Sequence, residues 1–486
     1  MTRTRVWLPV LWVGCAWAGP AIPAPPDFPA SPPEAPPLRP AELPPVTSEQ
    51  LDNGMEVVVI SNDEVPWVSA TWFLPAGAKF DPPQQSGLAM TTAALLRQGT
   101  ENYTADALAE LLDFHAIKLG GSAGYEKTFV HAGSLARNVG QAVACLADVV
   151  RRPVFADRAL GRHLEQQINE MKMLETAGCY RADCEFRRRL YGQHYLGRMP
   201  EGNSDTLPRI GRGDVVRFHK RHYMPNASVL VFSGAIDSRR ALSLAKKHFG
   251  DWQPGRMPAC PTAAIPPRSQ TRIYLVNRPE ATQSHIRIGQ VGFRRSDPEY
   301  LPAQVFNEVL GGSFKGRLHA AIRMKEGLCS DAQGQWLTGR QPGHLRVATA
   351  TGNETTAETL RTMLRVIRSM ATRAPSPEEL SDAKSFITGR FGLSLETPQA
   401  AAEKVFELKF HGLPHDYFKS YLQQVNSLSS SDVVDFARGT TNLDQLTIVV
   451  VGTADEFRDE LARIAPVVAV EGQTGPCPAR TTPVAK

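Results

Sequence analysis

Two pairs of histidines have the spacing of metal ligands that share one face of a helix. His219 and His222 lie three residues apart, and His411 and His415 lie four apart. Imidazoles at such spacing hold catalytic zinc when a third protein ligand and a carboxylate base lie close by. Neither pair has an Asp or Glu at a convincing ligand position, and no His-Glu-x-x-His sequence or its reverse occurs. We expect structural or surface roles for these histidines.

The segment 87–100 has the frame of a zinc helix without its ligands. It reads Gly-Leu-Ala-Met-Thr-Thr-Ala-Ala-Leu-Leu-Arg-Gln-Gly-Thr. It resembles the zinc helix of the insulinase/pitrilysin family of metallopeptidases, where Gly-Leu-Ala-His-x-x-Glu-His is followed by Gly-Thr. Met90 and Ala94 take the two His positions, and Ala93 takes the Glu position. A thioether and methyl groups neither bind zinc usefully nor deprotonate water, so we expect no intact catalytic residues and no metal.

Further blocks extend the resemblance over about residues 46–465. Each block alone is a weak signal, but together they follow the family's order and spacing. They are Leu51-Asp-Asn-Gly54, Gly120-Gly-Ser-Ala123, Leu146-Ala-Asp148, Tyr223-Met-Pro-Asn226 and Leu310-Gly-Gly-Ser313. The resemblance identifies the chain as a degenerate member of the processing-peptidase-like bacterial branch of this family.

The third zinc ligand of the family is a Glu that lies far downstream of the first His. Glu170 follows Met90 at the family's spacing and fits that block. A lone Glu cannot hold catalytic zinc, which uses three protein ligands. We interpret Glu170 as a retained structural carboxylate. If it is buried beside Met90, Ala93 and Ala94, its pKa should rise or it should find a hydrogen-bond donor.

The resemblance also implies residues that contact peptide. Active relatives use an Arg and a Tyr from the second half near the scissile carbonyl; here Arg323 matches the Arg, and Ser330 replaces the Tyr. Gly311 and Gly312 belong to the family's glycine loop. Substrate in the family pairs with an exposed sheet edge, here near residues 120–125, and this β-augmentation needs backbone groups only. We therefore assign candidate substrate contacts to Arg323, Ser330, Gly311, Gly312, Gly121, Ser122 and Ala123.

A weak internal repeat of domain length predicts the architecture. Residues 57–64 resemble 273–280, and residues 229–237 resemble 448–455. Strands alternate with long helices, for example at 105–114, 159–175 and 376–393, which favours an α+β fold with helices on one face of each sheet. We expect two homologous tandem domains, each a mixed or antiparallel sheet covered by helices, forming a clam-shell around a peptide cleft.

Composition sets the domain boundaries. Basic Arg3 and Arg5, an apolar run and Ala16-Trp-Ala18 predict a signal peptide over 1–18. A Pro/Ala-rich linker follows over 19–46 and a second, interdomain linker over 254–267. The peptidase-like domains are predicted at 47–253 and 268–466, with a flexible tail at 467–486.

The predicted signal peptide implies export to the periplasm of a Gram-negative bacterium, with an outer-membrane lipoprotein anchored through Cys15 as the alternative. No later segment is apolar enough to span a membrane.

Cysteines and charge add smaller expectations. An exported chain permits disulfides, and Cys179–Cys184 and Cys260–Cys477 are guesses at pairs, whereas Cys145 and Cys329 read as buried thiols. The formal net charge of +5 is spread among mixed signs and gives no case for nucleic acid. The run of three arginines at 187–189 is interpreted as a solvated helix face.

These inferences leave three functions open. The first is a non-catalytic subunit that pairs with a homologous zinc-bearing peptidase as a heterodimer and helps hold peptide substrates. In that case zinc is expected only in the partner subunit. The second is a stand-alone peptide-binding or chaperone-like pseudopeptidase. The third is an active metallopeptidase with unrecognised ligands. A neighbouring gene for a relative with intact His-x-x-Glu-His would favour the first.

Overall fold

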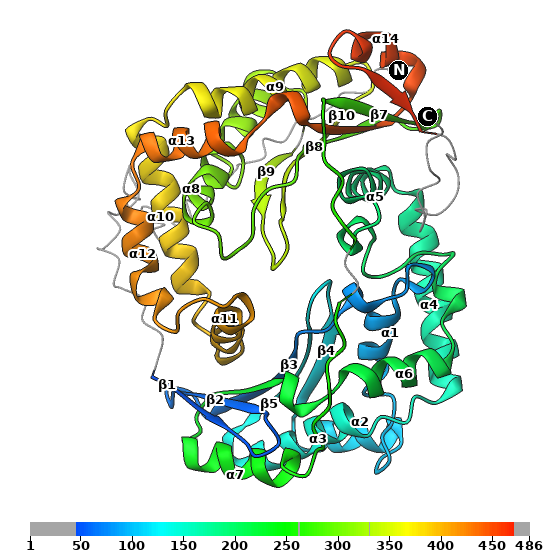
Figure 1. Cartoon of the computed structure of the whole chain (residues 1–486), viewed down its shortest axis with the longest axis vertical. Coiled ribbons are helices and arrows are strands. Elements are labelled where there is room, and N and C mark those ends of the chain that lie inside the picture. The colour runs from blue at the N-terminus through cyan, green and yellow to red at the C-terminus, as the bar shows by residue number, and fades with distance from the viewer. Residues whose placement is uncertain (1–44, 261–262, 330, 471–486) are drawn as a thin grey trace, which may run out of the picture. The chain divides into compact units, whose positions relative to one another are not determined.

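The computed structural model describes residues 45–260, 263–329 and 331–470. The predicted signal peptide, Cys15, Ser330 and Cys477 lie outside these residues. In the first half the elements are β1 (Val46–Gln50), β2 (Glu56–Ser61), β3 (Trp67–Leu74), α1 (Leu88–Leu95), α2 (Ala105–Phe114), β4 (Lys118–Ala123), β5 (Thr128–Leu135), α3 (Val139–Arg151), α4 (Asp157–Thr176), α5 (Gly178–Tyr191), α6 (Arg212–His222), β6 (Val229–Gly234) and α7 (Ser238–Phe249) (Figure 1).

The second half repeats this pattern with additional helices. Its elements are β7 (Arg272–Asn277), β8 (Gln283–Gly289), α8 (Tyr300–Leu310), the π-helix η7 (His319–Lys325), β9 (Ala332–Leu337), β10 (His344–Gly352), α9 (Thr356–Thr372), α10 (Pro377–Leu393), α11 (Pro398–His411), α12 (Tyr417–Ser427), α13 (Ser430–Thr440), β11 (Thr447–Gly452), α14 (Ala454–Ala462) and β12 (Val467–Ala469). The three helices expected from periodicity correspond to α2, α4 and α10.

The two sheets have matching strand orders. The first sheet runs β1-β2-β6-β3-β5-β4 and the second runs β12-β7-β11-β8-β10-β9. From the second strand onward the directions match: a parallel pair (β2 with β6, β7 with β11) is followed by three antiparallel pairs. The first pair differs, because β1 is antiparallel to β2 whereas β12 is parallel to β7. The architecture of two tandem α+β domains is therefore confirmed. β12 pairs with β7 inside the range expected to be a flexible tail, so ordered structure extends to Ala469.

Each half has its own hydrophobic core between one face of its sheet and the helices that follow. Strand alternation creates this core: Val57 and Val59 of β2 point into it, whereas Val58 and Ile60 point to the opposite face. The helices α3 and α7 cover the first sheet, and α8, α9 and α14 cover the second. The expectation of helices on one face of each sheet is nevertheless wrong, because helices also cover the opposite face.

The opposite face of each sheet is covered by a helix from the other half, which sequence reasoning did not predict. The helix α11 packs Ala402, Val405 and Phe406 on β2, β3 and β6 of the first sheet. The Phe406 ring stacks on Phe73 at 4.1 Å. Reciprocally, α5 packs on β8 and β11 of the second sheet, where Phe186 joins a buried apolar cluster. Helices therefore lie on both faces of each sheet (Figure 1).

The helix α5 also corrects two smaller expectations. Cys179 is an exposed free thiol while Cys184 is buried and disulfide-bonded, so a Cys179–Cys184 pair is wrong. Five residues on a helix place two side chains on different faces. The arginine run is not a solvated face, because Arg188 and Arg189 both bind the buried carboxylate of Glu185.

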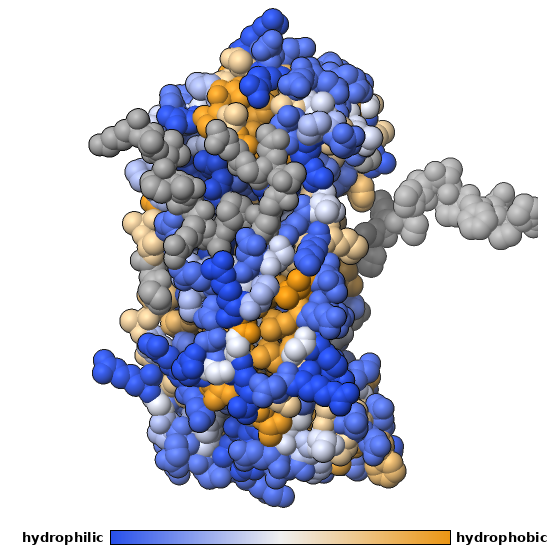
Figure 2. All heavy atoms as spheres, turned by 90° about the vertical axis from the view of Figure 1, so that its right-hand side faces the viewer, coloured by the Kyte–Doolittle hydropathy of each residue, from blue (hydrophilic) through white to orange (hydrophobic). Residues whose placement is uncertain are grey.

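The remaining cysteines of the described residues differ in burial. Cys145 is a buried free thiol, as expected, and Cys329 is a half-buried one. The Cys260 thiol faces the carbonyl oxygen of Lys79 at 3.6 Å and is not part of a disulfide, so its predicted pairing with Cys477 is wrong. Among the described residues, no helix is long and apolar enough to cross a membrane. The face turned toward the viewer in Figure 2 is mostly hydrophilic, with hydrophobic residues gathered in separate patches.

Candidate functional site

The degenerate zinc helix is α1, which packs between β4 and α4 (Figure 1). Its N-terminus is held by the buried carboxylate of Asp81, which accepts hydrogen bonds from the backbone N–H groups of Gly87 (2.9 Å) and Ala89 (3.0 Å). Burial raises the pKa of Asp81 to about 8, and the two hydrogen bonds oppose that shift. Gly87 has φ +102°, and a Cβ there would approach Glu201 O to 2.8 Å. The helix is thus fixed in place although its ligands are gone.

The former ligand positions have become packing positions. Ala93 is buried, and Met90 and Ala94 are half-buried, with Met90 packed against the first core. Their methyl and thioether groups do not fit a zinc ion, since they offer no nitrogen or oxygen donor. Among residues 45–260, 263–329 and 331–470, no three His, Cys, Asp or Glu side chains come together as metal ligands.

Glu170 lies on α4 and is exposed, so it is not buried beside Met90, Ala93 and Ala94. Its negative charge instead acts on a neighbour. Burial raises the pKa of the Glu201 carboxyl, and the charge of Glu170 adds to that increase. Glu201 also accepts a hydrogen bond from the Tyr180 hydroxyl at 3.2 Å. Glu170 therefore acts on a half-buried carboxyl and does not belong to a metal-binding set among the described residues.

A hollow of about 420 Å³ lies next to α1. Its lining comes from α1 and the turn after it, from β4, β5, α3 and α4, and none comes from the second half. The lining residues are Ala93, Ala94, Leu96, Arg97, Gln98, Leu119, Gly120, Gly121, Val130, Val149, His163 and Gln166. The hollow, which we call the α1 hollow, is lined both by two of the degenerate positions and by the predicted edge strand.

His163 and Arg97 were missed by sequence reasoning. His163 lies seven residues before Glu170 on α4, a spacing of two helical turns that could have indicated a shared face. Burial lowers the pKa of His163, which favours the neutral imidazole. Its Nε2 atom is buried with no partner among the described residues.

The strand β4 is an edge strand with a free side. Gly124 N donates to Lys127 O at 2.8 Å, so the register of β4 on β5 makes Ser122 and Gly120 the hydrogen-bonded positions. The backbone groups of Leu119, Gly121 and Ala123 therefore point away from the sheet. Ala123 is buried, whereas Gly121 is exposed.

The free side is limited at one end. Ala78 N and Lys79 N donate to Gly124 O and Tyr125 O and cover the turn after β4. The end of the predicted edge at 124–125 is therefore covered, and only the stretch beside the α1 hollow is open to a partner strand among the described residues. Gly121 must be glycine, because a Cβ would lie 2.6 Å from Phe129 O.

The candidate residues of the second half lie apart from this hollow. Arg323 is exposed on η7 and makes no hydrogen bond or ion pair with the residues that the structure describes. Gly311 is in close contact with Gly334, and a Cβ on Gly312 would lie 2.8 Å from the Glu308 carboxylate. The glycine loop is therefore explained by close packing. Ser330 lies outside the described residues.

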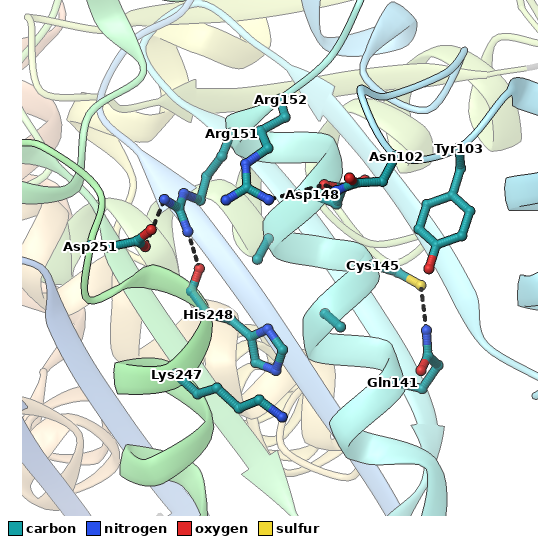
Figure 3. A pocket seen from close by; sticks show the side chains of 12 residues that line it. Asn102, Tyr103, Gln141, Cys145, Asp148, Arg151, Arg152, Lys247, His248 and Asp251 are labelled. Atoms are coloured by element: carbon teal, nitrogen blue, oxygen red, sulfur yellow. Dashed lines mark hydrogen bonds and ion pairs between the residues drawn. The ribbon is translucent and has the colours of Figure 1, made fainter.

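A second hollow, of about 250 Å³, lies between α3 and α7 and contains none of the predicted site residues (Figure 3). Arg151 pairs with Asp251 at 2.7 Å, and Asp148 accepts a hydrogen bond from the Asn102 amide at 2.6 Å. We assign it no ligand.

The histidine pairs have structural settings. The Nε2 of His219 lies 2.8 Å from Val150 O, and the Nδ1 of His222 lies 2.9 Å from Phe218 O. Both rings are buried among aromatic side chains. The helix α11 ends at His411, so His415 lies beyond its last turn and the two do not share a helix face.

His219 should make the fold sensitive to acid. Burial lowers its pKa to about 4 from an ordinary 6.5. The unfolded chain takes up this proton near pH 6.5 and the folded chain only near pH 4, so stability falls as the pH decreases through that interval. The contribution lost between pH 7 and 5 is about 2 kcal/mol. Urea unfolding of His219→Gln at both pH values should show a pH dependence smaller by that amount. An unchanged difference would contradict the assignment; the exposed His415→Gln is the control.

Comparison with known proteins identifies the family. Residues 56–182 match the family model described as insulinase (peptidase family M16), and residues 209–386 match the model described as peptidase M16 inactive domain. The two sheets, their order and the degenerate α1 define a peptidase-like fold without its zinc ligands. The chain belongs to the insulinase family, peptidase family M16.

Individual relatives carry differing names. A non-peptidase homolog from Helicobacter pylori is 22% identical over 77% of this chain and 86% of its own length. An uncharacterized zinc protease from Bacillus subtilis is 22% identical over 79% of this chain and 93% of its own. A solved peptidase M16 inactive domain from Pseudomonas fluorescens superposes with a TM-score of 0.78 at 23% identity, covering 88% of this chain and 100% of that one. The structural likeness shows the fold.

Proposed function

We propose that this chain is an exported, non-catalytic subunit that pairs with a zinc-bearing relative and helps to hold peptides for cleavage by that partner. The observation that carries the proposal is the replacement of both imidazoles and the carboxylate by Met90, Ala93 and Ala94 on a helix that is still held beside the edge strand β4. The name of the Helicobacter pylori relative, a non-peptidase homolog, agrees with a loss of catalysis.

Peptide binding is supported by the free side of β4. Its outward backbone groups can accept an additional strand without any metal, because β-augmentation uses main-chain hydrogen bonds. The loss of zinc ligands would leave that capacity unchanged. The α1 hollow beside Gly121 offers space for side chains of such a strand.

Pairing is supported by Arg323. An exposed guanidinium with no partner among the described residues is available to a substrate or to a second subunit. Its position matches the family's substrate-binding Arg. Export rests on the segment 1–18 alone.

The experiment that tests this function measures zinc content and peptide cleavage of the mature chain, alone and mixed with a His-x-x-Glu-His relative from the same organism. We expect no zinc and no cleavage alone, and cleavage raised on mixing. Arg323→Ala should lower the activity of the mixture by about tenfold or more, since charged hydrogen bonds contribute about 1.5–3 kcal/mol. The matched control is Arg239→Ala, an exposed arginine on α7.

The other outcomes separate the alternatives. Peptide binding without any effect on the relative's cleavage would favour a stand-alone peptide-binding protein. Stoichiometric zinc with cleavage by the chain alone would make it a metallopeptidase with other ligands and would overturn the proposal.

A further inference from the structure

The free side of β4 is already occupied at one atom. Arg97, exposed in the turn after α1, donates from Nη1 to the carbonyl oxygen of Leu119 at 3.3 Å. Leu119 is one of the outward-facing positions of β4, so this carbonyl is an acceptor that an added strand would use. Arg97 therefore lies on the side of β4 from which an incoming peptide N–H would approach the same oxygen.

The described residues around Arg97 include no carboxylate that would balance its positive charge. Of the described residues that line the α1 hollow, Arg97 carries the one permanent charge, and none is an Asp or Glu. Burial favours the neutral form of His163, so the imidazole adds no second cation. Gln98 and Gln166 contribute uncharged amide groups. Arg97 also forms no ion pair with the described residues.

Displacement of Arg97 from Leu119 would leave a guanidinium at the mouth of a hollow that holds no carboxylate. A guanidinium separated from its acceptor is destabilised unless a new acceptor takes its place. A carboxylate is the best replacement, because it forms paired charged hydrogen bonds with the guanidinium. A neutral peptide provides no such replacement.

We infer that Arg97 makes the β4 edge selective for peptides that place a carboxylate in the α1 hollow. The added strand takes the carbonyl of Leu119, and the carboxylate takes the guanidinium. The inference rests on the proposed peptide-binding function and adds to it the chemical class of the peptide. The carboxylate is either an acidic side chain or the C-terminus of the peptide.

The test uses the full mature chain and fluorescein-labelled, valine- and threonine-rich peptides of one length. One series has Glu at each position in turn with an amidated C-terminus, and a matched series has Gln. A third peptide has Gln throughout and a free C-terminus. Dissociation constants are measured by fluorescence anisotropy at low and high salt. We expect the best Glu peptide, or the free C-terminus, to bind about tenfold or more tightly than its neutral counterpart.

Two variants decide the role of Arg97. Arg97→Met, which keeps the aliphatic length and lies at an exposed position, should abolish the preference for the carboxylate and bind neutral peptides at least as well as the wild type. Arg239→Met removes the same charge from α7 and should keep the preference. Equal binding of Glu and Gln peptides by the wild type, or a preference that survives Arg97→Met, would overturn the inference while leaving peptide binding intact. Failure of every peptide to bind would instead reject the proposed peptide-binding function.

Discussion

Replacing Asp183 by alanine is expected to lower the free energy of unfolding by about 3 kcal/mol or more. Asp183 lies on α5 and forms bonds to two arginines of the second sheet, Arg287 of β8 at 2.7 Å and Arg346 of β10 at 3.0 Å. Burial alone would raise the pKa of the Asp183 carboxyl, but the hydrogen bonds and charges of these arginines lower it. Arg287 is 5% exposed, so the variant would leave a buried cation without its counter-ion.

The comparison for this variant is the exposed pair of Asp382 with Lys315. These side chains lie 2.8 Å apart but are 41% and 74% exposed. Asp382→Ala should therefore change stability by less than about 1 kcal/mol. Chemical denaturation of both variants and the wild type at pH 7 gives the two differences. Similar small losses would mean that Asp183 does not fasten α5 to the second sheet.

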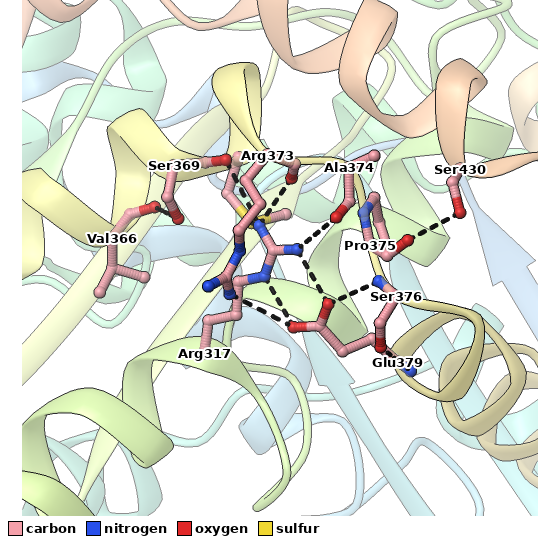
Figure 4. A network of polar contacts seen from close by, with 10 residues as sticks. Arg317, Val366, Ser369, Arg373, Ala374, Pro375, Ser376, Glu379 and Ser430 are labelled. Atoms are coloured by element: carbon pink, nitrogen blue, oxygen red, sulfur yellow. Dashed lines mark hydrogen bonds and ion pairs between the residues drawn. The ribbon is translucent and has the colours of Figure 1, made fainter.

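Replacing Arg317 by methionine is expected to cost about 3 kcal/mol of stability. Arg317 is 5% exposed and forms a bidentate pair with Glu379 at 2.8 and 2.9 Å (Figure 4). These hydrogen bonds lower the pKa of the Glu379 carboxyl. The guanidinium also donates to three carbonyl groups where α9 ends and α10 begins, those of Ser369, Arg373 and Ala374. One side chain therefore joins the segment before η7 to two helices.

Lysine should not restore this arrangement. Arg317→Lys keeps the charge but loses the planar fork that reaches a carboxylate and three carbonyls at once. We expect it to remain within about 1 kcal/mol of Arg317→Met. The control is Arg373→Met, whose side chain is 67% exposed and lies 3.8 Å from the same carboxylate; it should be nearly neutral. Thermal unfolding of the three variants measures the effect, and full stability of Arg317→Lys would contradict the role given to the fork.

Much of the fold could be predicted because it depends on local patterns. The repeat from 57–64 to 273–280 predicted the equivalence of β2 and β7, and the paired runs at 229–237 and 448–455 predicted that of β6 and β11. The exchange of α5 and α11 between the halves, in which each helix covers the sheet of the other half, was not predictable. A helix with an apolar face shows that it is buried but does not show against which sheet.

The site was only partly predictable for the same reason. Met90, Ala93 and Ala94 follow from one helix motif, and the edge strand follows from the Gly120–Ala123 block. Arg97 and His163 belong to the site only because α1, β4 and α4 meet in space. The guess of Cys179 with Cys184 was wrong because closeness in sequence does not make two side chains share a helix face.

The exchange of α5 and α11 has a consequence for how the molecule unfolds. Each sheet depends on the opposite half for one of its covering layers, so neither half can lose its structure without exposing apolar surface in the other. We infer that the duplicated chain behaves as one cooperative thermodynamic unit despite its two cores. The same exchange suits an origin in which two copies of a half-length ancestor each lent a helix to the other, before a tether joined them into one polypeptide.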